Sequence, residues 1–69
     1  MSLVTTPNLV DRDGVDAALV EAHRGLDEHQ SAALNARLIL ILVNHIGDSG
    51  VIADAIALAQ EAGSAPDPV

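Results

Sequence analysis

The sequence contains no cysteine, no aromatic residue and no lysine. Without cysteine the chain cannot form a disulfide scaffold, a cysteine-based zinc site or a thiol nucleophile. Ten Asp and Glu residues stand against three Arg residues, so the formal net charge is −7. The chain therefore lacks the basic surface and the aromatic rings that nucleic-acid binding uses, and we expect no nucleic-acid partner. An apolar content of 49% also argues against disorder.

The chain is short for a domain that is stable alone. It has 69 residues, and chains below roughly 70–80 residues are marginal unless something further holds them. Aromatic rings, which would each bury about 150–250 Å², are absent. The core must therefore be built from Leu, Ile, Val and Ala. We expect another chain, either a second copy or a different protein, to cover part of its apolar surface.

We expect no signal for secretion or membrane insertion. The first ten residues carry no Arg or Lys, unlike the start of a secretory signal. Residues 38–43 form the longest apolar run, whereas a membrane-spanning helix needs about 20 apolar residues. We expect a cytoplasmic protein without a membrane partner.

Residues 13–24 have the pattern of an amphipathic helix. Asp13 is expected to cap it, and Gly25 follows Arg24 as a stop signal. Its apolar residues recur with the i, i+3, i+4, i+7 spacing of one helix face. They are Val15, Ala18, Leu19 and Ala22.

Two further helices follow. Asp27 and Gln30 have the spacing of a capping box, which predicts a second helix from there to about Ile46. The next glycine can take the left-handed stop position, and Asp48 or Ser49 is expected to cap a third helix.

The predicted fold is all-α, a small three-helix bundle with an extended N-terminal arm, and we expect it to be oligomeric. Residues 1–10 form the arm, which is expected to pack across the helices. Residues 11–63 form the three-helix domain, and residues 64–69, with two prolines, form a flexible tail.

The middle helix is the unusual one. Its segment LILILV, residues 38–43, covers every direction of a helical wheel, and a helix that is apolar all round is normally buried on all sides. The run could also form a buried strand. We favour a helix, because the run continues a segment with helical spacing and a lone strand would have no partner. Two short flanking helices can cover only part of it, which is the main reason to expect a partner.

Several motifs resemble known chemistry but lack its full set of residues. The string GDSG, residues 47–50, surrounds the nucleophile of chymotrypsin-like proteases, but here it lies between two predicted helices. Residues 11–14, DRDG, match part of a calcium loop without its first and last ligands. His23, His29 and His45 lack the helical spacing of a metal site. We therefore expect no metal, no cofactor and no catalytic residue.

The middle helix also carries polar residues among its apolar ones. Arg37, Asn44 and Asp48 fall within about 20° of one line along an ideal helix. Leaving such groups unpaired in an apolar environment costs about 1–3 kcal/mol each. They either bond to loops and helix ends within the bundle or fix the register of an interface. The candidate interaction residues are Asn35, Arg37, Ile41, Asn44, His45 and Asp48.

Four strings in the sequence carry a likeness to a known family. They are TPNL at residues 6–9, HRGL at 23–26, SAALNARL at 31–38 and NHIGD at 44–48. The chain resembles, from residue 5 to about residue 62, a small bacterial family of short helical proteins described as a domain of unknown function. Residues 34–48 are the most specific part. The chain departs from the family at residues 14–15, where bulkier aromatic residues are expected nearby.

The resemblance implies an association with a flavin enzyme, since members are often encoded beside, or fused to, a flavin-dependent aromatic hydroxylase or oxidoreductase. The expected function is therefore a non-catalytic accessory subunit that docks on a flavin-dependent monooxygenase or related oxidoreductase. The alternative is a self-assembling helical homo-oligomer with a structural or regulatory role.

Overall fold

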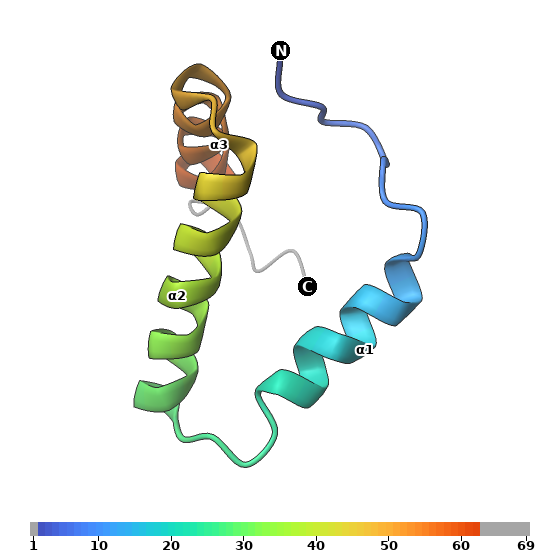
Figure 1. Cartoon of the computed structure of the whole chain (residues 1–69), viewed down its shortest axis with the longest axis vertical. Helices are drawn as coiled ribbons and strands as arrows, with labels where there is room; N and C mark the ends of the chain where they lie inside the picture. Colours follow the sequence, from blue (N-terminus) through green and yellow to red (C-terminus); the bar gives the residue numbers. More distant parts are fainter. Residues whose placement is uncertain (1, 63–69) are drawn as a thin grey trace.

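The described part of the chain folds into three α-helices, which confirms the predicted all-α class. The computed structural model describes residues 2–62, and Figure 1 shows its course. Helix α1 spans Arg12–Ala22, α2 spans Glu28–Ile46 and α3 spans Ser49–Ala62. Residues 38–43 lie within α2, so the strand alternative for this run is wrong. Gly63 and the tail predicted for residues 64–69 lie outside the described residues.

Helix α1 begins and ends two residues earlier than predicted. Asp11, not Asp13, is its cap, because the Asp11 carboxylate accepts the backbone N–H of Gly14 at 3.1 Å. A Cβ at position 14 would meet that carboxylate, so a larger residue there would require the Asp11 side chain to shift. The helix ends at Ala22, which leaves Arg24 in the following turn.

Helix α2 has the predicted boundaries. The Asp27 carboxylate accepts the backbone N–H of Gln30 at 2.8 Å, and the Gln30 side chain accepts the N–H of Asp27 at 3.0 Å. This is the predicted capping box. At the other end Gly47 has a φ of 67°, the left-handed conformation expected of a stop residue, and donates to the carbonyl of Val43.

Helix α3 is capped by Asp48, one of the two predicted residues. The Oδ1 atom of Asp48 accepts the backbone N–H groups of Gly50 at 3.0 Å and of Val51 at 3.1 Å. The connection between α2 and α3 therefore has only two residues, 47 and 48. Because this connection is so short, α3 turns back close to the C-terminal end of α2.

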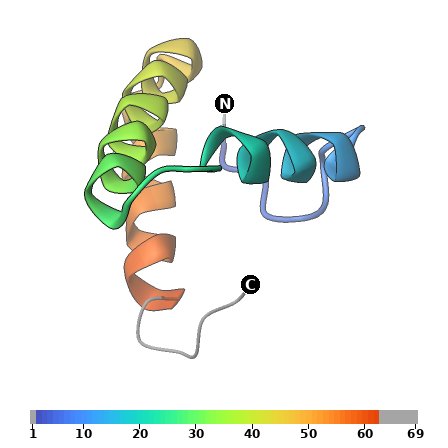
Figure 2. The ribbon, with the colours of Figure 1, turned by 90° about the horizontal axis from the view of Figure 1, so that it is seen from below.

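The three helices are arranged openly. Among the described helices, only α2 and α3 approach within 8 Å between Cα atoms, whereas α1 extends away from this pair in both Figure 1 and Figure 2. The radius of gyration is 13.5 Å, compared with about 11 Å for a compact chain of this length. Within the described part of the chain, the single buried side chain is Val51, which is 7% exposed.

Residues 2–10, in the predicted arm, form neither helix nor strand. Leu3 is half-buried and lines a groove together with residues of α2 and α3, while Val4, Leu9 and Val10 are exposed. Packing of the whole arm across the helices stays a prediction. None of the described helices is long and apolar enough to span a membrane.

Candidate interaction surface

The first candidate surface is the concave space between α1 and α2, which we call the α1–α2 groove. It has a volume of about 360 Å³. Each helix contributes four residues with the same i, i+3, i+4, i+7 spacing, so each wall is one helix face. The lining residues are Val15, Ala18, Leu19 and Ala22 from α1, and Leu34, Arg37, Leu38 and Ile41 from α2.

The second candidate surface is the α2–α3 groove, which has a volume of about 370 Å³ and no polar lining residue. It lies where the start of the arm meets α2 and α3. Its α3 wall combines two alanines with β-branched valine and isoleucine residues. The lining residues are Leu3, Ile39, Leu42, Val43, Ile46, Val51, Ile52, Ala55, Ile56 and Ala59.

Helix α2 therefore has apolar side chains in several directions, and the rest of the described chain leaves many of them exposed. Leu40 is 68% exposed and Ile41 is 64% exposed, and Ile39 and Leu42 are also exposed. The sequence predicted that this helix is apolar all round, and the isolated chain leaves it largely open to water. Contiguous exposed apolar surface of this kind marks interaction sites in soluble proteins.

A hydrogen-bonded link joins the end of α1 to α2. The Nδ1 atom of His23 lies 2.6 Å from the carbonyl oxygen of Leu19, and its Nε2 atom lies 2.8 Å from Oδ1 of Asn35. Both partners are oxygen acceptors, so the protonated imidazole can donate to both at once. The bond to Leu19 and then the bond to Asn35 raise the pKa of His23 above its ordinary value of 6.5.

Charged residues are unevenly distributed around the α1–α2 groove. Arg12 pairs with Asp16 at 3.7 Å, and Arg24 pairs with Glu21 at 2.8 Å; both pairs are exposed. Arg37 lines the groove and has no ion pair among the described residues. The described part of the chain contains no group of three or more His, Asp or Glu residues that could hold a metal ion.

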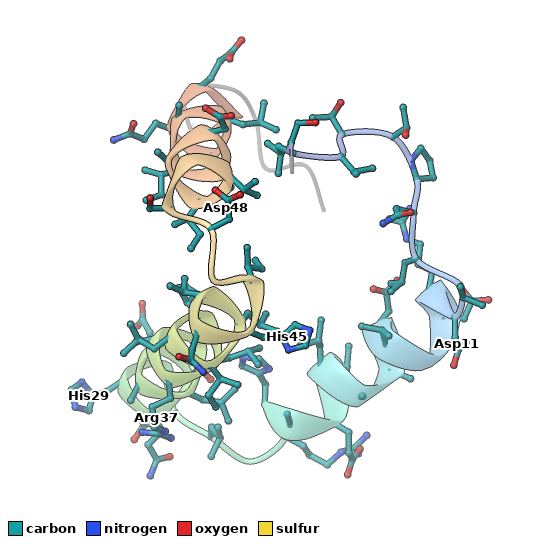
Figure 3. The ribbon with its side chains drawn as sticks, turned by 45° about the horizontal axis from the view of Figure 1, so that its top comes forward. Asp11, His29, Arg37, His45 and Asp48 are labelled. Carbon is teal, nitrogen blue, oxygen red and sulfur yellow. The ribbon has the colours of Figure 1, made fainter. Side chains whose placement is uncertain are left out.

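The predicted interaction residues lie in different places. Arg37 and Ile41 line the α1–α2 groove, and Figure 3 shows His45 directed toward the space between α2 and α1. Asn35 is bonded to His23, and the carboxylate of Asp48 is engaged in capping α3.

Asn44 is exposed on α2. Asp48 is half-buried and accepts two backbone N–H groups, which matches the alternative that some polar residues satisfy helix ends. Participation of the six residues in an interface stays a prediction.

Sequence reasoning missed that the α1 face takes part in this surface. The signal was present, because Val15, Ala18, Leu19 and Ala22 repeat the spacing of residues 34, 37, 38 and 41 on α2. The bond between His23 and Asn35 had no such signal, since it depends on how the turn between the helices bends.

A family model described as "Protein of unknown function (DUF2783)" matches residues 3–61, which is most of the chain. The chain belongs to the DUF2783 family. This membership confirms the resemblance to a domain of unknown function and adds no catalytic or binding residue to those described above. No curated protein and no solved structure matches the chain.

Proposed function

We propose that this DUF2783 protein is a non-catalytic interaction subunit that docks on a flavin-dependent monooxygenase or a related oxidoreductase. The observation that carries the proposal is the imbalance between buried and exposed apolar residues. Val51 alone is buried in the described part of the chain, whereas thirteen large apolar residues are exposed. Burial of apolar surface is the main driving force of folding, and a chain in this state buries little of it. A protein partner can bury the rest.

The chemistry of the surface favours binding over catalysis. Both grooves are lined by aliphatic side chains, and Arg37 is the one ionisable residue that lines either of them. General acid–base or nucleophilic catalysis needs at least two cooperating groups around a reacting atom. Apolar surface with a single charge has the composition of the centre of a protein–protein interface.

The class of partner comes from the family resemblance, in which the short helical proteins accompany flavin-dependent aromatic hydroxylases or oxidoreductases. We place the docking surface on the outward side of α2, around Leu40, which lines neither groove. The complex is expected to form in the cytoplasm.

The proposal is tested by co-expressing the full chain with the oxidoreductase encoded beside its gene. The native mass of the purified complex should exceed that of the oxidoreductase by a whole multiple of 7.1 kDa, measured by light scattering with refractive-index detection because the chain has no Trp or Tyr. Calorimetry with Leu40→Asp should show affinity at least about tenfold weaker, because a charge would enter the apolar contact.

The matched control is Val20→Asp, an equivalent exchange on the outward side of α1. Val20 is 66% exposed, close to the 68% of Leu40, and also lines neither groove. This variant should bind like the unchanged chain. Separate elution of chain and enzyme, with no heat of binding at micromolar concentrations, contradicts the proposed function.

A further inference from the structure

The α1–α2 groove lacks an occupant from the described part of its own chain. Its two walls belong to helices that do not approach within 8 Å between Cα atoms, so their apolar faces are separated by open space. Val15, Leu19 and Ile41 are exposed as a result. A partner that fills this groove needs an apolar helix face of similar length.

The exposed area indicates the size of the missing contact. The chain exposes 5981 Å², whereas a compact protein of 7.1 kDa exposes about 4,100 Å². The excess is on the order of 1,000–2,000 Å² per chain. Obligate homodimers bury about 2,000–5,000 Å² in total over both chains. A second copy of the same chain is therefore large enough to remove the excess.

The two walls of the groove differ in the size of their side chains. The α1 face combines Val15 and Leu19 with the small residues Ala18 and Ala22, so another helix can approach it closely. A twofold dimer uses the same surface on both chains. If α1 of each copy enters the groove of the other, four helix faces become covered in one step, as in a four-helix bundle.

Charge favours pairing α1 with α2 across the dimer. Helix α1 carries one Arg and three acidic residues, whereas α2 has no carboxylate after Glu28. Arg37 therefore has no acidic neighbour on its own helix. Asp16 flanks the apolar face of α1, and its exposed 3.7 Å contact with Arg12 is of a kind that contributes little.

We propose that two copies of this chain form a symmetric dimer in which α1 of each copy occupies the α1–α2 groove of the other, with Arg37 of one chain paired with Asp16 of the other. Helix α1 of the second copy then fills the groove, and Arg37 pairs with the Asp16 carboxylate of that copy. This inference does not depend on docking to an oxidoreductase, because that docking is placed on the outward side of α2.

The test is the native mass of the full chain over a range of concentrations, measured by light scattering with refractive-index detection. The expected mass is twice the 7.1 kDa of one chain. Arg37→Glu and Asp16→Arg should each weaken the dimer about tenfold, because each places two like charges together. Combining both exchanges should restore the dissociation constant to within about threefold, since the pair is rebuilt with reversed signs.

The matched control is Arg24→Glu, the same exchange at an arginine that lines neither groove. It should leave the dissociation constant unchanged. Circular dichroism of every variant separates loss of pairing from loss of helix, and rescue by the double exchange excludes simple unfolding.

Three results overturn the inference. One is a mass of 7.1 kDa at every concentration. Another is a dimer that both single reversals leave intact, and the third is a monomer that pairs only with the oxidoreductase. In the third case the proposed function survives, so the two proposals fail separately.

Discussion

The two corners of the molecule use similar local devices and reach opposite results. The α1–α2 corner, residues 23–27, and the α2–α3 corner, residues 47–48, each contain a glycine with positive φ and end in a capping aspartate. Yet α3 packs on α2, whereas α1 stays apart. Capping and stop residues therefore set where the helices begin and end, but not whether they pack.

The difference lies in connection length and in the side chains that meet. The α2–α3 corner has two residues and keeps α3 close to α2, and Val51 is buried where it lines the α2–α3 groove with β-branched and leucine residues of α2. The α1–α2 corner has five residues, so the connection does not force the α1 face against α2. Burial stabilises by about 25 cal/mol per Å², and α1 forgoes this gain within its own chain because it does not approach α2.

The largest expected effect comes from disrupting the α2–α3 contact at Val51, the one buried side chain in the described part of the chain. Val51→Asp should lower the free energy of unfolding by at least about 2 kcal/mol, because it buries a charge without a partner. The measurement is denaturant unfolding followed by circular dichroism at fixed chain concentration. Val20→Asp on the open side should change the unfolding free energy by less than about 0.5 kcal/mol. Equal losses would mean that the α2–α3 contact is not the stable part of the fold.

A smaller effect is expected from the corner glycines. Gly47 and Gly25 have φ values of 67° and 76°, and neither would place a new Cβ closer than ordinary contact, so alanine acts through backbone strain alone. Gly47→Ala should lower the unfolding free energy by about 1 kcal/mol. Gly25→Ala should cost less, because the longer connection can relax while α1 is unpacked. Thermal unfolding compares the two, and a greater loss at Gly25 contradicts this view of the open corner.

The features that the sequence predicted correctly are the local ones. The capping box of Asp27 and Gln30, the stop at Gly47 and the cap by Asp48 all act within four residues, so spacing alone identifies them. The wrong cap of α1 has a local cause too. Asp11 and Asp13 are both suitable, since each has a backbone N–H three residues later, and the structure uses Asp11.

The features that sequence could not supply are those that depend on how far apart two helices lie. The sequence indicated that two short helices could cover only part of residues 38–43, and residues 39–42 are exposed, but it did not show which helix would stay apart. Arg37 was chosen for its position among apolar residues, and it does line a groove. The bond between His23 and Asn35 follows from the angle at the α1–α2 corner, which no short pattern encodes, whereas the α1 wall of the groove had a signal in its apolar spacing.

The smallest expected effect concerns the hydrogen bond between His23 and Asn35 at the α1–α2 corner. It tests which interaction holds α1 in position. The pKa of His23 is raised in the folded chain, so the link stabilises fully below the ordinary pKa of 6.5 and is lost as the pH rises through the folded-state pKa. A neutral imidazole can donate from only one nitrogen, so it gives up one of the two bonds.

Asn35→Leu should lower the pKa of His23 toward 6.5, measured by NMR titration of the ring carbons. The fall should be partial, because the bond to Leu19, the larger cause, remains. Asn44→Leu, the same exchange at an exposed site on α2, should leave the titration unchanged. If Asn35→Leu left the pKa of His23 unchanged, the hydrogen bond between His23 and Asn35 would not link α1 to α2. The position of α1 would then be set by a second chain alone, because the small apolar face of α1 makes no backbone contact with the other described helices of its own chain.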